Sequence, residues 1–340
     1  MKFTVLSLKE ALGLPLAHDL TQIDVETGYK GAHFRRGHIV TEEDLETLRS
    51  MGREHLTLME LEADEVHEDD AALKLAPFAA GPGVTLQGPR EGKCILVADH
   101  AGLLDYAVDA VNAINGEGQW IFSTLPPHSP VRKGETVAAF RILPLCVGEE
   151  EVARACAAAR PVQVLPFRPL TTGLVTTGRE IAEGRIKDAF FPKLERKVAA
   201  FGGSLAGQRT VSDDREAITE AIAAFLDEGV DLVVCTGGMS VDADDLTPAA
   251  IEAVADEILF RGVPALPGSM LMLGRKGGKA IVGAPACVIH DERTTLDPLL
   301  QLLFAGLFPT EKDVRLWGVG GLCRHCPVCC YPDCAFAARP

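Results

Sequence analysis

The chain alternates strand-like and helix-like segments from Thr171 to about Phe308, and this alternation constrains its fold more than any other feature. The apolar run at residues 232–235 is typical of a buried strand, and residues 212–229 have the capped amphipathic pattern of a helix. A helix between successive strands indicates β-α-β units, which build parallel sheets covered on both faces. We therefore predict a three-layer α/β domain with a mostly parallel sheet over residues 170–311.

The segments outside this domain show different patterns. Residues 61–72 are acidic, and we expect them to form a solvated surface segment. We predict four further parts: an N-terminal α+β segment over residues 1–72, a β-rich middle domain over 73–148, a linker helix with a Pro-rich linker over 149–169, and a Cys-rich tail over 312–340.

The charge of the chain limits its partners. Net charge is −15, with 48 acidic against 33 basic residues, which argues against a nucleic-acid backbone as the main partner. The N-terminus lacks the pattern of a signal peptide, and no apolar run approaches eighteen residues. We expect a cytoplasmic protein that binds neither membrane nor nucleic acid, and we expect a homo-oligomer.

The stretch VVCTGGMSVDADDLTP at residues 233–248 is the first candidate site. Gly237 and Gly238 permit positive φ and close approach of a ligand, and backbone N–H groups beside a helix starting near Thr247 favour phosphate. Thr247 and Pro248 suit an N-cap and a first helical position. The acids Asp242, Asp244 and Asp245 would repel phosphate unless they hold Mg²⁺. The alternative is an ordinary strand–helix turn with solvated acids.

Two further stretches have the composition of ligand loops. Residues 175–188 place Thr177 and Gly178 at a strand end and continue to Glu180, Gly184 and Asp188, with an exposed turn and a capped helix as the alternative. Residues 263–291 contain a Pro267–Gly268 loop and a hairpin with three cations, for which a solvated hairpin tip is favoured over an anion site. A structural role is also favoured for His290 beside Asp291. The three hairpin cations are Arg275, Lys276 and Lys279.

The tail concentrates half of the ten cysteines of the chain within twelve residues. This density indicates thiolate ligation of Zn²⁺ or of an iron–sulfur cluster, and His325 is an alternative ligand. A redox-labile tail or a set of disulfides remains the other interpretation. The predicted metal ligands of the tail are Cys323, Cys326, Cys329, Cys330 and Cys334.

Taken together, these motifs resemble the molybdopterin-binding domain of molybdenum-cofactor biosynthesis proteins, over about residues 170–308. The similarity extends to the molybdopterin molybdotransferases and the corresponding half of gephyrin. The Gly-Gly loop of that family matches Thr236, Gly237, Gly238, Ser240, Asp245 and Thr247. The upstream strand-end pattern matches Thr177, Gly178, Glu180, Gly184 and Asp188, and the Pro-Gly loop matches Pro267 and Gly268.

The resemblance implies roles for these residues. Adenylylated molybdopterin would lie across the strand ends with its phosphates on the Gly237–Gly238 turn. Mg²⁺ would bridge phosphate and an acid, for which Asp245 is the first choice and Asp242 the second. Molybdate insertion would then proceed with Asp245, Asp188 and Ser240 as the catalytic group, and molybdopterin or its adenylylated form as the partner.

The chain also departs from the insertion enzymes. It has Asp242 where they usually have Gly, and residues 284–287 replace their Leu-Pro-Gly-Asn-Pro loop. Their Asp-Gly-Tyr signature and their C-terminal β-barrel are not recognisable in the sequence. A second hypothesis is therefore a non-catalytic molybdopterin carrier or sensor with a redox or metal-binding tail. A third, ranked last, is a CinA-like nucleotide-processing enzyme.

Overall fold

The structure is a computed structural model of the whole chain, and it describes residues 2–24, 29–178, 189–240, 242, 245–334 and 336–337. The chain forms two compact units. The first consists of Met1–Val97, Tyr106–Thr124 and Glu135–Gln163, and the second of Ala98–Asp105, Leu125–Gly134 and Val164–Pro340. Within the described residues, no helix combines the length and the apolarity needed to cross a bilayer.

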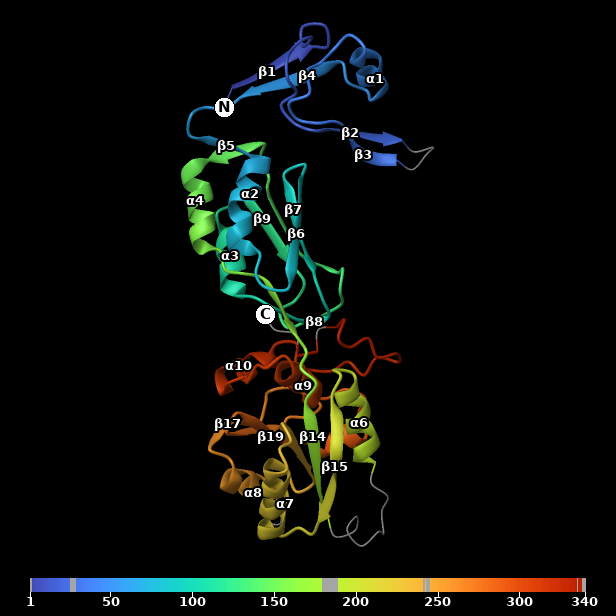
Figure 1. Cartoon of the computed structure of the whole chain (residues 1–340), viewed down its shortest axis with the longest axis vertical. Helices are drawn as coiled ribbons and strands as arrows, with labels where there is room; N and C mark the ends of the chain where they lie inside the picture. Colours follow the sequence, from blue (N-terminus) through green and yellow to red (C-terminus); the bar gives the residue numbers. More distant parts are fainter. Residues whose placement is uncertain are drawn as a thin grey trace. The chain divides into compact units, whose positions relative to one another are not determined.

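A six-stranded sheet forms the centre of the second unit (Figure 1). Its strands are β14 (Thr171–Thr177), β15 (Ser204–Val211), β16 (Leu232–Thr236), β17 (Glu257–Arg261), β18 (Met272–Lys276) and β19 (Lys279–Ala284). They lie in the order β15–β14–β16–β19–β18–β17, and β15, β14, β16 and β19 pair in parallel. Only β18 runs against the others in this sheet, because it pairs antiparallel with both β19 and β17. The predicted mostly parallel sheet is confirmed.

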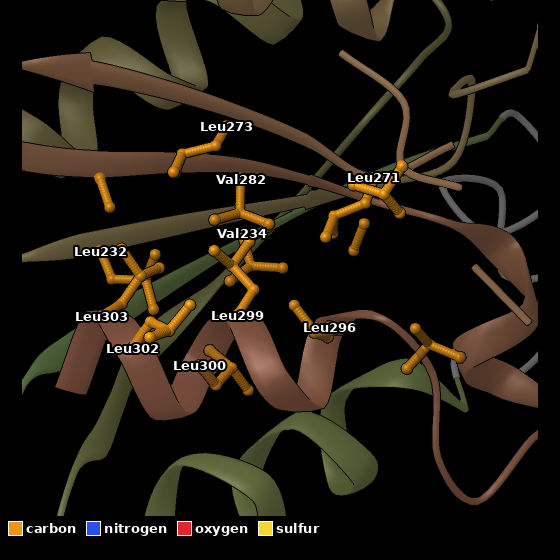
Figure 2. Packing of buried hydrophobic residues seen from close by; sticks show 14 of the residues in the cluster. Leu232, Val234, Leu271, Leu273, Val282, Leu296, Leu299, Leu300, Leu302 and Leu303 are labelled. Atoms are coloured by element: carbon orange, nitrogen blue, oxygen red, sulfur yellow. The ribbon is translucent and has the colours of Figure 1, made fainter. Parts of the chain in front are cut away.

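Helices cover both faces of this sheet, as its alternating side chains require. The helices are α6 (Phe190–Ala199), α7 (Arg215–Asp227), α8 (Thr247–Val254), α9 (Leu296–Phe304) and α10 (Glu311–Arg315). Leu232 and Val234 of β16 belong to one buried cluster with α6 and α9, whereas Val233 and Cys235 belong to another with α7 and α8. Figure 2 shows the leucines of α9 packed on the face that carries Leu232 and Val234.

The second unit contains a smaller sheet as well. Its three strands are β8 (Gly102–Asp105), β10 (Pro130–Val131) and β13 (Gln163–Pro166), in the order β10–β8–β13. Gly102 allows β13 to pass close, because a Cβ at this position would collide with the carbonyl of Leu165. Segments from the middle of the sequence are therefore built into the second unit.

The first unit has two parts that follow one another in sequence. The N-terminal part contains α1 (Asp44–Ser50) and two antiparallel strand pairs, β1 (Lys2–Ser7) with β4 (His55–Glu60) and β2 (Leu20–Asp24) with β3 (Tyr29–Phe34). The next part has a four-stranded sheet in the order β6–β7–β11–β9. These strands are β6 (Val84–Arg90), β7 (Lys93–Ala98), β9 (Trp120–Thr124) and β11 (Thr136–Ile142).

Three helices and a short strand pair accompany the four-stranded sheet. The helices are α2 (Glu68–Ala79), α3 (Val108–Gly116) and α4 (Glu149–Ala158), and the pair is β5 (Glu65–His67) with β12 (Cys146–Gly148). The expectation that residues 61–72 form a solvated segment holds only for residues 61–64 and Asp70, which are exposed. His67 and Glu68 are buried, and Ala71 and Ala72 lie in the core, because this segment forms β5 and the first turns of α2.

Candidate functional site

The ends of three parallel strands meet at one edge of the large sheet. The register aligns Thr176 of β14 with Thr236 of β16, and Thr236 with Ala284 of β19. The loop between β17 and β18, which contains Pro267 and Gly268, lies at the same edge because β18 runs in the opposite direction. In open α/β sheets ligands bind outside the carboxyl ends of the strands. The described residues Thr177 and Gly178, the Gly237–Gly238 turn and the Pro267–Gly268 loop are therefore brought to one edge.

The Gly237–Gly238 turn has the backbone conformation that its sequence predicts. The φ angles are +89° for Gly237 and +54° for Gly238. A Cβ at Gly237 would lie 2.5 Å from both the carbonyl oxygen and the hydroxyl of Thr177, and a Cβ at Gly238 would lie 3.0 Å from the hydroxyl of Thr247. Only glycine fits at Gly237, where left-handed backbone coincides with close approach of a neighbouring strand end.

Thr247 closes the loop that follows this turn. Its side-chain hydroxyl donates a 2.8 Å hydrogen bond to the carbonyl oxygen of Gly237. The prediction of an N-cap at Thr247 is wrong, because α8 begins at Thr247, its N-cap is Leu246, and no side chain caps it. Pro248 lies in the first turn, as the sequence indicates. The hydroxyl of Thr247 therefore stabilises the glycine turn and does not cap α8.

Thr177 contributes an unsatisfied polar group at the same turn. Only 4% of Thr177 is exposed, and its hydroxyl oxygen has no hydrogen-bond partner among the described residues. Burying a hydroxyl without a partner is unfavourable, so such an atom marks a place where a ligand or ordered water can bind. The hydroxyl lies on the side of the strand end that faces Gly237.

The Pro267–Gly268 loop is fastened to the start of α9. The hydroxyl of Thr295 donates a 2.6 Å hydrogen bond to the carbonyl oxygen of Gly268, and the N–H of Thr295 donates to the carbonyl oxygen of Pro267 at 3.1 Å. Gly268 has a φ of +114°, and a Cβ there would overlap the hydroxyl of Thr295. Sequence reasoning missed Thr295. The run Thr294–Thr295 ahead of the apolar α9 could have indicated it.

A buried ion pair holds the first turn of α9, and sequence reasoning missed it too. The ammonium group of Lys197 on α6 lies 2.6 Å from a carboxylate oxygen of Asp297, and both side chains are buried. Arg293 lies 3.0 Å from the same oxygen, and the N–H of Thr294 donates to the other oxygen at 2.8 Å. These contacts satisfy the buried carboxylate and fix α6 against the turn that carries Thr295.

The acids of the loop are only partly described. Asp242 is exposed, and its N–H donates a 3.2 Å hydrogen bond to a carboxylate oxygen of Asp245, whose own N–H donates to the carbonyl oxygen of Asp242 at 3.0 Å. Ser240 is exposed as well. Asp244 and the predicted residues Glu180, Gly184 and Asp188 lie outside the described residues.

The predicted hairpin between β18 and β19 turns at Gly277 and Gly278, where Lys276 pairs with Lys279. Both lysines donate to carbonyl oxygens at helix ends, Lys276 to Val254 at 2.9 Å and Lys279 to Leu226 at 2.7 Å. Arg275 forms an ion pair with Glu257 at 2.7 Å. The tip of this hairpin, residues 275–278, is exposed, as the favoured interpretation of a solvated hairpin tip expects, and all three cations have partners. His290 is exposed.

The cysteine tail is anchored at its start by a backbone hydrogen bond and by apolar packing. The N–H of Cys323 donates to the carbonyl oxygen of Leu266 at 2.8 Å, and Cys323 and Cys334 pack against the apolar cluster of α9. The neighbouring thiol of Cys326 is the main cause that raises the pKa of Cys330, which is exposed. Among the described residues, however, no group of three or more His, Cys, Asp or Glu side chains is arranged to hold a metal ion.

The family comparison identifies two segments of the chain. Residues 173–302 match a family described as a probable molybdopterin binding domain, which agrees with the resemblance found in the sequence. Residues 5–60 match a family described as a domain of unknown function (DUF8806).

Curated relatives match parts of the chain. A CinA-like protein of Mycolicibacterium vanbaalenii is 35% identical over 141 residues, covering 36% of this chain and 33% of that protein. A CinA-like protein of a Mycobacterium species (strain MCS) is 42% identical over 80 residues, covering 23% and 19%. A molybdopterin molybdenumtransferase of Staphylococcus epidermidis is 29% identical over 123 residues, covering 34% and 29%. The chain thus spans about a third or less of the length of these relatives.

Two solved structures whose names refer to molybdopterin biosynthesis are similar to part of this chain. The enzyme MoaB from Thermus thermophilus is 20% identical, with a TM-score of 0.35, and the match covers 42% of this chain and 99% of that chain. A molybdopterin biosynthesis protein from Mycobacterium abscessus is 23% identical, with a TM-score of 0.36, and the match covers 40% and 94%.

Proposed function

We propose that this chain, whose residues 173–302 belong to the molybdopterin-binding domain family, binds molybdopterin at the Gly237–Gly238 edge of its large sheet and acts in molybdenum-cofactor biosynthesis. The observation that carries the proposal is the turn itself. Two glycines leave no side chain in the way, and the buried hydroxyl of Thr177 faces them without a partner among the described residues.

The turn suits the phosphate of the pterin. Among hydrogen bonds between described residues, none uses the N–H of Gly238, and α8 starts close by at Thr247. Free backbone N–H groups beside a helix N-terminus favour an anion. The residues that would hold the ligand are Thr177, Gly178, Thr236, Gly237, Gly238, Ser240, Thr247, Pro267 and Gly268, with Glu180 from the segment that the structure does not describe.

Mg²⁺ is compatible with this site only if the ligand supplies part of its coordination. Asp245 has one carboxylate oxygen engaged by the N–H of Asp242, and the described residues offer no group of three metal ligands. Mg²⁺ commonly binds one or two carboxylates together with substrate phosphates and waters. We therefore assign Asp245, and secondarily Asp242, as the acids that would hold Mg²⁺ against the phosphate and offset its charge.

For the activity, we favour insertion of molybdate into adenylylated molybdopterin. The protein would position the adenylate against the turn, and Asp245, Ser240 and Asp188 would orient the reacting groups. Binding without turnover, as in a carrier or sensor, is the alternative that the replaced loop at residues 284–287 favours. The CinA-like relatives favour a third candidate, a nucleotide-processing enzyme.

The test uses the anaerobically purified full chain, first for binding of molybdopterin and then for turnover. Gly238→Val should abolish binding, because its side chain would enter the turn beside Thr247. Gly229→Val is the matched control, since Gly229 also has positive φ but no atom within 4 Å of an added Cβ. A wild-type chain that does not bind molybdopterin would contradict the proposal.

Turnover assays then separate the three candidate activities. Conversion of adenylylated molybdopterin with molybdate and Mg²⁺, lost in Asp245→Ala with binding retained, supports insertion. Tight binding without conversion supports the carrier. Turnover of nicotinamide mononucleotide, with neither of the other results, supports the CinA-like alternative.

A further inference from the structure

A cavity of about 590 Å³ lies in the first unit, far along the sequence from the residues of the proposed molybdopterin site. It is lined by the segment at Asp19 and Arg35 and by the hairpin of β6 and β7, including Gln87, Arg90 and Lys93. Cavities of this size are typical of small-molecule sites. The proposed function does not use any residue of this cavity.

The lining carries an excess of positive charge. Three of its side chains are cations, Arg35, Arg90 and Lys93, against the single acid Asp19. The ion pairs found among the described residues include none of these three cations. In a chain with a net charge of −15, three cations that line one cavity and have no ion pair among the described residues favour the binding of an anion.

The strand pattern explains why these cations face the cavity. Lys93 and Ile95 alternate along β7 with Cys94 and Leu96, which are completely buried in the core. Side chains two residues apart share one face of a strand, so Lys93 and Ile95 both line the cavity on the face away from the core. The cavity thus combines an apolar wall at Ile95 with a cationic rim.

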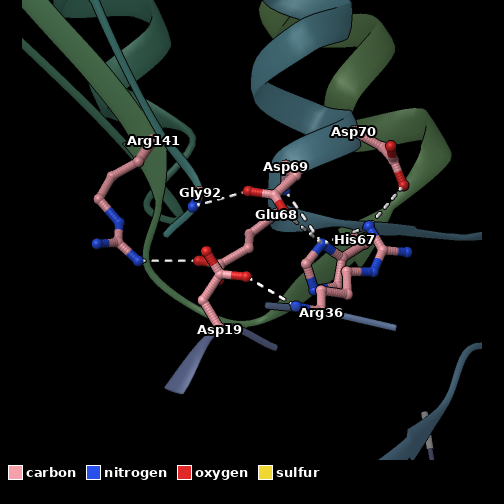
Figure 3. A network of polar contacts seen from close by, with 8 residues as sticks. All are labelled: Asp19, Arg36, His67, Glu68, Asp69, Asp70, Gly92 and Arg141. Carbon is pink, nitrogen blue, oxygen red and sulfur yellow. Dashed lines mark hydrogen bonds and ion pairs between the residues drawn. The ribbon is translucent and has the colours of Figure 1, made fainter. Parts of the chain in front are cut away.

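The N-terminus of α2 holds both walls of the cavity in place (Figure 3). Arg36, next to Arg35, donates from its guanidinium to His67 at 3.0 Å and to Asp70 at 3.3 Å, and its N–H donates to Asp19 at 2.8 Å. On the other wall, the N–H of Gly92, next to Lys93, donates to Asp69 at 2.9 Å.

Gly92 is also fixed by packing. A Cβ there would collide with the carboxylate of Glu68, which is itself paired with Arg141 at 2.9 Å. Asp69 and Asp70 of α2 therefore anchor the segments at Gly92 and Arg36. The adjacent cations Lys93 and Arg35 line the cavity. Such a supported arrangement is what a binding site needs, because ligand affinity falls when the walls must first be ordered.

We propose that this cavity binds a small phosphate-bearing anion, held by Arg35, Arg90, Lys93 and the amide of Gln87, with its apolar part against Ile95. Arg presents a planar donor fork that matches phosphate, and Lys adds a point charge. This site is independent of the Gly237–Gly238 turn, which lies in the second unit.

Titration of the full chain with inorganic pyrophosphate by calorimetry tests the proposal. Arg35→Gln, Arg90→Gln and Lys93→Gln should each weaken binding by about tenfold or more, since a hydrogen bond to a charged group contributes about 1.5–3 kcal/mol. These side chains make no ion pair with described residues, so the variants should melt like the wild type. Lys9→Gln, another exposed lysine outside the lining, is the matched control and should leave affinity unchanged.

Three further results decide the interpretation. Gly238→Val should retain pyrophosphate binding, and loss of binding in that variant alone would move the site to the second unit. Citrate, a polyanion without phosphate, should bind at least tenfold more weakly, and equal affinity would overturn the assignment to phosphate. Absence of wild-type binding at low ionic strength, where charge attraction is strongest, would overturn the site itself.

Discussion

The hydroxyl of Thr247 lies 2.8 Å from the carbonyl oxygen of Gly237, ten residues earlier in the chain. This single bond joins the glycine turn at the end of β16 to the first residue of α8. It closes the acidic loop between them and turns the carbonyl of Gly237 toward the helix, so the turn is held in one conformation before any ligand arrives. Preorganisation of this kind reduces the ordering cost of binding.

Thr247→Val removes this bond while keeping the branched shape of the side chain. We expect the variant to lose about 1 kcal/mol of folding free energy, the usual contribution of a neutral hydrogen bond, and to bind molybdopterin more weakly. Chemical unfolding and ligand titration measure the two effects. Thr219→Val is the control, since its hydroxyl donates to the backbone carbonyl oxygen of Arg215 within α7, and it should leave ligand affinity unchanged.

Gly237→Ala should destabilise the second unit more than Gly229→Ala. Both glycines have φ near +90°, so both variants carry the strain of an alanine in left-handed backbone, about 1 kcal/mol. At Gly237 the new Cβ would also meet the carbonyl and hydroxyl of Thr177 at 2.5 Å, whereas at Gly229 it would meet nothing. Equal losses of unfolding free energy in the two variants would show that the turn can relax.

His67 should make the first unit less stable in acid. Burial is the main cause that lowers the pKa of His67 below its ordinary value, and Arg36 adds to the effect. Its stabilisation is therefore complete above about pH 6.5, the value for an unfolded chain, and is lost as pH falls toward the depressed folded pKa. The slope for one proton is at most about 1.4 kcal/mol per pH unit.

The measurement compares unfolding free energies of the wild type and His67→Gln between pH 8 and pH 5.5. The difference isolates His67 from groups such as Glu68, whose pKa burial raises and whose effect has the opposite sign. Trp120 is buried in the first unit and Trp317 in the second, so a Trp317→Phe background reports on the first unit alone. If the unfolding free energies of the wild type and of His67→Gln changed in parallel with pH, His67 would not be the cause of the acid sensitivity.

The metal of the cysteine tail stays a prediction from cysteine spacing, and metal analysis can test it. The anaerobically purified chain should contain Zn²⁺ or iron, and Cys329→Ser or Cys330→Ser should lower the metal content several-fold. Cys156→Ser, in α4 of the first unit, should not change it. A metal-free wild type, or a metal content that the tail variants leave unaltered, would favour a thiol or disulfide tail.

The sequence predicted the large domain well because β16 is a fully buried apolar strand and α7 is an amphipathic helix with a side-chain cap at Asp214. It also predicted the conformation of Gly237 and Gly238, since few other residues tolerate positive φ. The edge strand β15 was missed because its residues, SLAGQRTV, are mostly half-exposed and lack an apolar run. An edge strand pairs on one side only, so its composition need not look buried.

The first unit was harder to predict for a different physical reason. The acids that open α2 looked solvated, but Glu68 pairs with Arg141, and Asp69 and Asp70 anchor Gly92 and Arg36. Each acid is separated from its partner by 23 to 73 positions, and no local pattern reports such contacts. The hydroxyl of Thr247 was misassigned for the same reason, because its acceptor lies across the loop.

Because the two units are built from interleaved segments, the protein cannot be divided into two continuous fragments that each contain one unit. The backbone passes between the units near residues 97, 105, 124, 134 and 163, so neither unit corresponds to one uninterrupted stretch of the gene. A nascent chain cannot complete the first unit until Gln163 has been synthesised, when β8 and β10 of the second unit already exist without their partner β13. Although the two units have separate cores, neither can be expressed as one continuous fragment of the chain, and we expect them to fold and to be degraded together.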